Sequence, residues 1–484
     1  MFTFTKKMKR STGGYLLVLV LVFGAVFFTI MSSFVVFIVT QSRLIAQRVE
    51  FEQAGQIAES GLSYYKWYLA HYPNDLTNGT GLPGPYVGIF NDPEGGAIGQ
   101  YSLSLASTTY CGDVASIDVT SVGYTYKNPV VKRTISARYS RPSVAEFAFI
   151  LNSSVWAGPD RVINGPYHSN GGVRMDGTHN SVVTSNVGNW QCTPSFGCTP
   201  TTTRNGVFTT TGNATPALFD FPTTPVNFAG LVVDLAQMKT RAQTQGGVYI
   251  GPSTGFGYHL VFNNDGTVTV RTVTNTHQYW GMTTEFGWQQ ERNVMSATST
   301  PTVYTIPATC PLIYVEDNVW IQGVVRDRVA LAAASATINP TVILQGNITY
   351  TSATTSGLLA IAEQNVLIGV DVPDDMTING IYIAQNGRYG RNFYCNNTLY
   401  CSTARLLPNA TPNLRQFTIR NSETMNGTIV SNGRVGTQWI YSGNAISGFR
   451  ERYNTYDRNL VANPPPLVPL ISDVYEFTEW RDAN

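Results

Sequence analysis

The chain has few charged residues. Only 13% of its 484 residues are Asp, Glu, Lys or Arg, and the formal net charge is +1. This fraction is about half of that in ordinary globular proteins. A nearly neutral chain lacks the basic surface with which nucleic acid is bound, so we expect no nucleic-acid partner. Its 44 Gly and 25 Pro residues, with frequent Thr and Asn, predict short strands and turns of a β-rich extracellular protein.

Signs of catalysis are also scarce. The sequence has no phosphate-binding loop and no HExxH zinc motif, and no histidine follows His277. Glycosidases need paired carboxylates, but Asp374-Asp375 in VDVPDDM is explained more simply as an acidic turn. His168, Asp176 and His179 could hold a metal or exchange protons, but we favour a polar corner of the β structure. We therefore expect no catalytic residue, no cofactor, no metal and no enzymatic activity.

The six cysteines include two pairs with the same spacing. Cys192 and Cys198 enclose five residues in CTPSFGC, and Cys395 and Cys401 do so in CNNTLYC. Zinc sites usually place two to four residues between cysteines and add histidine, which neither segment contains. We therefore predict two local disulfides, as expected for a chain exported from the cytoplasm. The remaining two cysteines, at positions 111 and 310, have no pairing that the sequence can fix.

A long apolar run lies near the N-terminus. The 25 residues from Tyr15 to Val39 carry no charge. A helix of this length extends about 37 Å, which exceeds the roughly 30 Å hydrocarbon core of a bilayer. Lys6, Lys7, Lys9 and Arg10 precede it and predict a cytoplasmic N-terminus. Because the run is longer than a secretory signal and lacks a small-residue cleavage site, we expect a single-pass anchor in the cell membrane, with most of the chain outside the cytoplasm.

The helical pattern continues beyond the membrane segment. Pro73 ends it, and Asn74-Asp75 begins a turn. The apolar residues of this half recur at steps of three and four, which places them on one face of a helix that packs against a sheet. They are Phe51, Ala54, Ala58, Leu62, Tyr65 and Leu69.

The N-terminal region resembles a known family. A basic leader that ends in Gly13-Gly14, an apolar helix and the stretch Gln53–Leu62 (QAGQIAESGL) are similar to the start of PilX-type minor type IV pilins. The resemblance covers about 70 residues, and it implies a prepilin peptidase junction between Gly14 and Tyr15. The fifth residue after this junction is Leu19, where major pilins carry glutamate. The following segments QYSLSLAS, ASIDVTSVGYTY and VVKRTISARYS alternate polar and apolar residues, as in the antiparallel sheet of a pilin head.

The second half of the chain contains repeated short strands. Gly323, Gly346 and Gly369 lie 23 residues apart in turn. This regular spacing predicts the coils of a parallel β-solenoid. Ordinary hairpins or a β-sandwich are the alternative, because Asn-Gly is also a hairpin signal. Three of the short strands are bracketed by Asn-Gly pairs, at residues 164–165 and 170–171, 379–380 and 386–387, and 426–427 and 432–433.

Together these features predict an α+β, mostly β protein with a transmembrane helix, a pilin-like sheet and a right-handed parallel β-helix that carries an α+β insertion. We expect a minor or tip component of a type IV pilus or pseudopilus, whose β-solenoid is an adhesive or spacer module. Its expected partners are the membrane, other pilins or assembly components, and a surface glycan or protein. The alternatives are an envelope adhesin that stays anchored outside any filament, or a polysaccharide-acting β-helix enzyme.

The expected segments are a leader (1–14), the helix (15–72), the pilin-like sheet (73–145), a first solenoid part (146–200), the insertion (201–300), the main solenoid (301–460) and a Pro-rich C-terminal cap (461–484).

Overall fold

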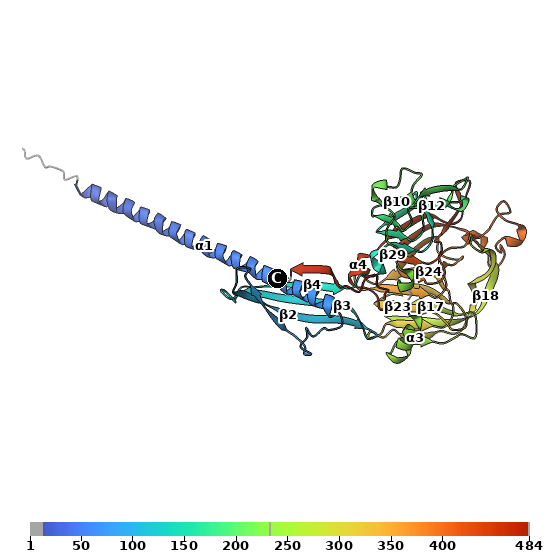
Figure 1. Ribbon diagram of the computed structural model, residues 1–484, viewed down its shortest axis with the longest axis horizontal. Helices are drawn as coiled ribbons and strands as arrows, with labels where there is room; N and C mark the ends of the chain where they lie inside the picture. Colours follow the sequence, from blue (N-terminus) through green and yellow to red (C-terminus); the bar gives the residue numbers. More distant parts are fainter. Residues whose placement is uncertain (1–12, 232–233, 483–484) are drawn as a thin grey trace, which may run out of the picture.

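A computed structural model describes residues 13–231 and 234–482. Helix α1 (Gly13–His71) projects from a small antiparallel sheet, and a larger β body lies at the opposite end of the molecule (Figure 1). The predicted long N-terminal helix and mostly-β body are confirmed. The basic residues 6–10, from which we predicted the orientation, lie outside the described residues.

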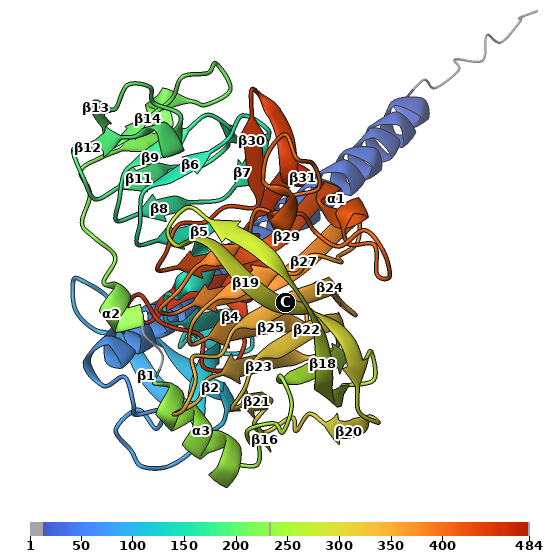
Figure 2. The same cartoon turned by 90° about the vertical axis from the view of Figure 1, so that its right-hand side faces the viewer.

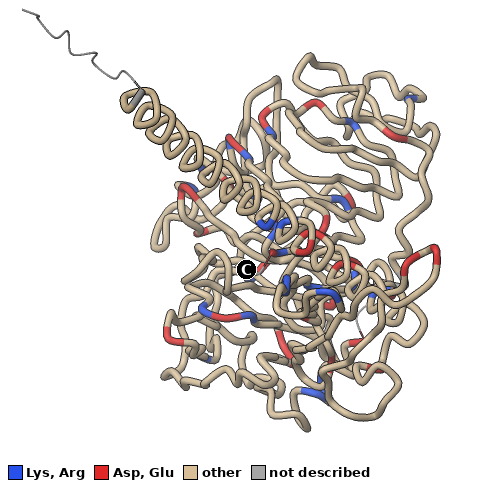
Figure 3. The backbone as a smooth tube through the Cα atoms, turned by 90° about the vertical axis from the view of Figure 1, so that its left-hand side faces the viewer, with Lys and Arg blue, Asp and Glu red and all other residues tan. Residues whose placement is uncertain are grey.

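The two halves of α1 have different surroundings. Large apolar side chains are exposed throughout its first half, from Tyr15 to Ile45. By its length and composition, α1 is able to cross a membrane. Charges are sparse over the whole backbone tube, and the outer turns of the helix carry none (Figure 3). From Glu50 onward one face of α1 is buried, including the predicted residues Ala54, Ala58, Leu62, Tyr65 and Leu69.

The buried face of α1 packs on a five-stranded antiparallel sheet. Tyr139 donates its hydroxyl hydrogen to the Leu62 carbonyl at 2.7 Å. Gly123 allows the helix to approach the sheet closely, because a Cβ there would lie 2.3 Å from the Ala54 oxygen. The strands, in sheet order, are β1 (Tyr86–Asn91), β2 (Ala97–Tyr110), β3 (Asp113–Thr125), β4 (Lys132–Ser140) and β32 (Glu476–Asp482).

The last strand differs from our expectation for the C-terminus. We expected residues 461–484 to cap the β body, but residues 476–482 return to the small sheet and pair with β4. The short helix α4 (Arg458–Ala462) and a proline-rich segment precede this strand. An edge strand has only one neighbour and alternates weakly, so EFTEWRD gave little strand signal.

A buried carboxylate stabilises the place where α1 meets the sheet, and its replacement is our first testable prediction. Glu50, 4% exposed, lies 2.8 Å from Lys127 Nζ and accepts a hydrogen bond from Thr125 at 2.6 Å. These contacts with Lys127 and Thr125 lower the pKa of Glu50. Its contribution to stability is therefore complete above the unfolded-state pKa of about 4.3 and is lost as the pH falls through the lower folded-state pKa.

We expect Glu50→Gln to lower the free energy of unfolding by about 1–3 kcal/mol at pH 7, because Thr125 loses a charged acceptor. The measurement is urea unfolding of the full chain in detergent at pH 7 and below pH 4. The exposed Glu59 provides the control, and Glu59→Gln should change stability by less than about 0.5 kcal/mol. Equal effects of the two substitutions at pH 7 would contradict this role of Glu50.

The β body is built on parallel ladders. One ladder joins the strands β16 (Val248–Ile250), β21 (Leu312–Val315), β23 (Arg328–Ala333), β25 (Gly357–Ala362), β27 (Asp375–Ala384), β29 (Ile419–Ser431), β5 (Phe149–Leu151), β8 (Tyr167–Ser169), β11 (Val183–Ser185) and β15 (Phe219–Asp220). A second joins β17 (Tyr258–Phe262), β22 (Val319–Val325), β24 (Val342–Tyr350), β26 (Val366–Ile368) and β28 (Tyr389–Gly390). A third continues from β27 and β29 through β31 (Asn444–Thr455) and β7 (Arg161–Asn164) to β10 (Thr178–His179).

The Asn-Gly repeats explain one contact between these strands. Asn379 and Gly380 of β27 lie in parallel register with Asn426 and Gly427 of β29, and the two asparagine side chains are hydrogen-bonded at 2.9 Å. Both glycines have positive φ, and a Cβ at Gly427 would lie 1.9 Å from the Gly380 oxygen. These two Asn-Gly pairs are therefore bends within stacked strands, and not the turns of hairpins. The third differs, because Asn164 is the last residue of β7 and pairs with Thr455.

The segment 201–300, expected as an insertion, is only partly separate from the ladders. Its strands β16 and β17 belong to them, while helices α2 (Phe228–Leu231) and α3 (Leu235–Thr244) lie beside them. The hairpin of β18 (Thr267–Thr283) and β19 (Gly287–Thr298) crosses the second ladder (Figure 2). Val273 and Met295 of this hairpin pack on Trp320 and Ile343.

Candidate functional site

All six cysteines form disulfides in the structure. It joins Cys192 to Cys198 and Cys395 to Cys401, the two pairs with matching spacing. It also joins Cys111, at the β2–β3 turn, to Cys310 in the β body. The backbone N–H of Cys111 donates to the Thr309 carbonyl at 3.0 Å, beside this link. A covalent bond therefore holds the small sheet to the body.

Asp176 has a structural position. It is 1% exposed and accepts hydrogen bonds from Trp156 at 2.9 Å, the Arg174 guanidinium at 2.6 Å and the Thr210 amide at 2.8 Å. These contacts occupy both carboxylate oxygens of Asp176 and link the segments near residues 156, 174 and 210.

The two neighbouring histidines are also held by local contacts. His168 lies 2.8 Å from the Thr184 hydroxyl and 3.0 Å from the Asn170 side chain, and burial lowers its pKa. His179 accepts from the Thr215 amide at 3.0 Å. Within the described part of the chain, no group of three His, Cys, Asp or Glu residues could hold a metal ion.

Two further patterns have structural positions. Asp375, expected in an acidic turn, is the first residue of β27, and it accepts hydrogen bonds from Asn421 and Ser422 of β29, both at 2.6 Å. The segment 251–255 (GPSTG) has G-x-S-x-G spacing, which sequence reasoning missed. A nucleophile elbow requires a strand followed by a helix, but this segment lies between strands β16 and β17. The Ser253 hydroxyl accepts the Gly255 amide at 3.1 Å, as in a local turn.

Gly14 and Tyr15, the expected processing junction, lie in the first turn of α1. The Tyr15 side chain is 77% exposed, and nothing lies within 4 Å of the position that a Cβ of Gly14 would occupy. The leader before them lies outside the described residues.

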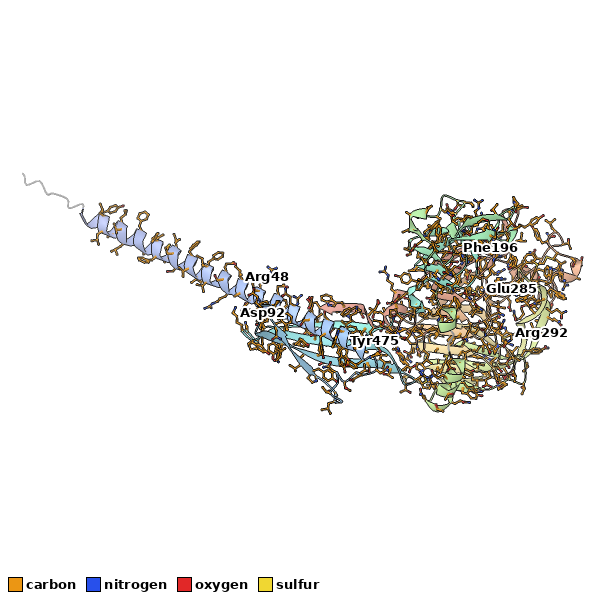
Figure 4. All side chains as sticks on the ribbon, in the orientation of Figure 1. Arg48, Asp92, Phe196, Glu285, Arg292 and Tyr475 are labelled. Atoms are coloured by element: carbon orange, nitrogen blue, oxygen red, sulfur yellow. A yellow bond between two sulfur atoms is a disulfide. The ribbon has the colours of Figure 1, made fainter. Side chains whose placement is uncertain are left out.

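A groove of about 910 Å³ lies between the β18–β19 hairpin and the second ladder. Phe196, Glu285 and Arg292, which line it, lie on the part of the body away from the exposed half of α1 (Figure 4). Its floor is formed by the segments that follow strands β21, β23, β25, β27 and β29 of the first ladder, which we call corners. At about 4.8 Å between neighbouring strands, five corners extend roughly 19 Å. They contribute Asn318, Thr341, Asn365, Asn386 and Asn432.

Amide side chains connect the corners of the groove. Asn318 accepts the Thr341 amide at 2.9 Å, and Asn365 accepts the Arg388 amide at 3.0 Å. Asn432 accepts from Asn152 at 2.8 Å. These contacts hold the asparagine side chains in place at the corners, so the groove has a preformed polar floor.

Three arginines line the groove, and two are half-buried. Arg388 and Arg434 are partly covered, whereas Arg292 is exposed. Arg434 donates to the Ser195 carbonyl at 2.7 Å and lies 4.1 Å from the centre of the Phe196 ring. Burial lowers the pKa of Arg434 to about 10, and burial also lowers the pKa of Arg388. None of the three forms an ion pair within 4 Å with another described residue.

The acidic groups of the groove do not neutralise these arginines directly. Glu291 accepts from Tyr394 at 2.9 Å, from Asn293 at 3.2 Å and from Asn392. Burial raises the pKa of Glu291. Glu285 is exposed between the two strands of the hairpin. The groove thus combines cationic walls with a floor of neutral amides. Sequence reasoning missed it, because its residues lie on corners and a hairpin far apart in the chain.

The fold defines a protein with an apolar N-terminal helix packed on a small antiparallel sheet and joined to a large, mostly-β body. No family model matches the chain, and no curated protein matches it. Among solved structures, it is similar to the crystal structure of the competence-associated pilin ComZ from Thermus thermophilus. That alignment covers 90% of this chain and 97% of ComZ, with 13% identity and a TM-score of 0.27. A similarity this weak assigns no function.

Proposed function

We propose that this chain is a membrane-anchored, PilX-like minor or tip component of a type IV pilus or pseudopilus, and that its β body is an adhesive module. The main support is the change along α1 near Glu50. Before this residue the helix exposes its apolar side chains on all sides, and after it one face packs on the small sheet.

The exposed half of α1 needs an apolar environment. Burial of a Leu, Val, Ile or Phe side chain is worth about 1.5–3 kcal/mol. The first half of the helix exposes many of these side chains, including Leu17, Phe23, Phe28 and Phe37. A bilayer can bury them first, and the apolar helices of other pilins can bury them in a filament. The helix would then cross the membrane with the β body outside the cytoplasm.

The β body suits an outward contact role. We propose that the body is a right-handed β-helix. Its parallel stacking is supported by the ladders, in which the Asn-Gly bends at 379–380 and 426–427 lie in register. Such a body is stiff, and the groove lies on its part away from the anchor (Figure 4). A surface glycan or protein could reach this position without approaching the membrane. Contact of this kind requires no catalysis.

The mature N-terminus tests this proposal, and this is our second prediction. We expect mass spectrometry of protein from its native membrane to find a chain that begins at Tyr15, as pilin processing requires. Gly14→Val should leave the leader in place, because the junction would lose the glycine that precedes the cut. Tyr15→Phe is the matched control and should be cleaved like the native chain. An intact leader on the native chain would instead support a permanently anchored envelope adhesin.

A further inference from the structure

We propose that the groove between the β18–β19 hairpin and the second ladder binds an anionic, uronic-acid-containing polysaccharide, with Arg388 and Arg434 as the carboxylate-binding residues. This inference rests on the adhesive role proposed above, and it names the ligand class and the site.

The first argument is unbalanced charge. Arg388 is half-buried, and its guanidinium forms no hydrogen bond or ion pair with a described residue. Arg434 is also half-buried and gives one hydrogen bond, to a carbonyl. A guanidinium that is partly shielded from water gains when an anion pairs with it, because its charge is then compensated. Its planar fork of donors matches a carboxylate, so an anionic ligand would supply what these two side chains lack.

The nearby glutamates do not already fill that role. Glu291 is held by Tyr394, Asn293 and Asn392. Glu291 and Glu285 attract Arg388 at longer range, but neither forms an ion pair with it within 4 Å among the described residues. Glu285 is exposed at the hairpin turn. The two arginines therefore keep their donors available to a ligand in the groove.

The second argument is the shape and chemistry of the floor. Five successive corners form a row of roughly 19 Å, long enough for an extended chain and not only for a small anion. Amide side chains offer both donors and acceptors, which sugar hydroxyls require. Aromatic rings of Phe196 and Phe256 add apolar faces on the walls. A polymer with hydroxyls along its length and carboxylates at intervals fits this combination.

The charge count favours a polysaccharide over a nucleic acid. The groove is lined by three arginines, two glutamates and no lysine. Nucleic-acid binding depends on many phosphate contacts made by basic side chains, and the chain as a whole is nearly neutral. A uronic-acid polymer needs fewer cationic contacts, because neutral hydroxyls supply the others.

The test, our third prediction, is binding of defined polymers to the full chain in detergent, measured by titration calorimetry. The probes are a polygalacturonate oligomer and the same oligomer after reduction of its carboxyl groups, which keeps the sugar chain and removes its charge. We expect the reduced oligomer to bind at least about tenfold more weakly. Polygalacturonate binding should also weaken as salt is raised from 50 to 500 mM, because partly exposed charges are screened.

Arg388→Gln is the primary variant, because this side chain has no hydrogen bond to lose in the folded protein. We expect it, and Arg434→Gln, to weaken polygalacturonate binding by about tenfold or more each. Arg450→Gln is the matched control, since Arg450 is exposed, forms no ion pair with a described residue and does not line the groove. Circular dichroism should show the same fold for all three variants.

Several results would overturn the inference: no binding of polygalacturonate, equal binding of the reduced oligomer, native affinity in both arginine variants, or tighter binding of a single-stranded oligonucleotide. The outcome is separate from that of N-terminal sequencing. A chain with an intact leader that binds polygalacturonate would remove the filament role and keep the groove. A chain processed at Tyr15 that fails to bind would remove only the groove.

Discussion

Replacement of Asp176 by alanine is expected to lower the free energy of unfolding by about 3–5 kcal/mol, because it leaves a buried cation without its partner. The Arg174 guanidinium, 11% exposed, lies 2.6 Å from Asp176 and 4.3 Å from the centre of the Trp156 ring. It also donates to the Phe196 carbonyl and the Thr210 hydroxyl. These contacts tie the strands near residue 175 to the loop closed by the Cys192–Cys198 disulfide.

The loss should exceed that of an ordinary surface carboxylate. Asp374, whose side chain is 63% exposed, lies 3.5 Å from Arg420, and Asp374→Ala should cost at most about 1 kcal/mol. Asp176→Asn keeps the shape but not the charge, so it should fall between the two. The measurement is urea unfolding of the full chain in detergent, with hydrogen exchange of the amides in residues 173–185. A cost below about 1 kcal/mol for Asp176→Ala would show that Arg174 finds another partner or water.

The elements of this fold that depend on neighbouring residues could be predicted from the sequence. The apolar stripe of α1 from Ala54 to Leu69 and the alternation of residues 97–140 predict a helix on a sheet, and the structure has both. Each of these features can be recognised within a short window of residues. The 23-residue spacing of Gly323, Gly346 and Gly369 is different, because Gly323 pairs with Ile348 and not with Gly346. Paired residues of the first ladder lie at unequal intervals along the chain, from 18 residues (Leu312 and Ala330) to 47 residues (Asp375 and Ser422).

Features that join distant segments could not be predicted in the same way. Strand β32 reaches the small sheet from the far end of the chain, and its sequence is mostly polar. The groove combines corners near Asn318 and Asn432 with a hairpin whose glutamates face both solvent and protein. Nothing in the sequence near Arg388 shows that it lies half-buried and without an ion pair. Spacing indicated two cysteine pairs, but it said nothing about the third.

Removal of this third disulfide, Cys111–Cys310, is expected to have the second large effect on stability. The disulfide between Cys111 and Cys310 spans 199 residues, whereas Cys192–Cys198 spans six. A cross-link stabilises mainly by restricting the unfolded chain, and the effect grows with the enclosed length. The chain-entropy relation gives about 5 kcal/mol for the long loop and about 2 kcal/mol for the short one. We therefore expect the double variant Cys111→Ser, Cys310→Ser to be destabilised more than Cys192→Ser, Cys198→Ser.

The position of this bond adds a mechanical consequence. It fixes the β2–β3 turn to the body, next to the ion pair between Arg241 and Asp113. Exposed ion pairs are worth little, so the disulfide is the stronger of the two links. Urea unfolding of both double variants in detergent measures the order of stability, and small-angle scattering of the first reports whether the body moves relative to α1. Equal destabilisation of the two variants would mean that the noncovalent contacts at this turn already restrain the long loop. The expected order instead makes Cys111–Cys310 an effective cross-link between the small sheet and the body, in addition to the main chain that runs from β4 to β5.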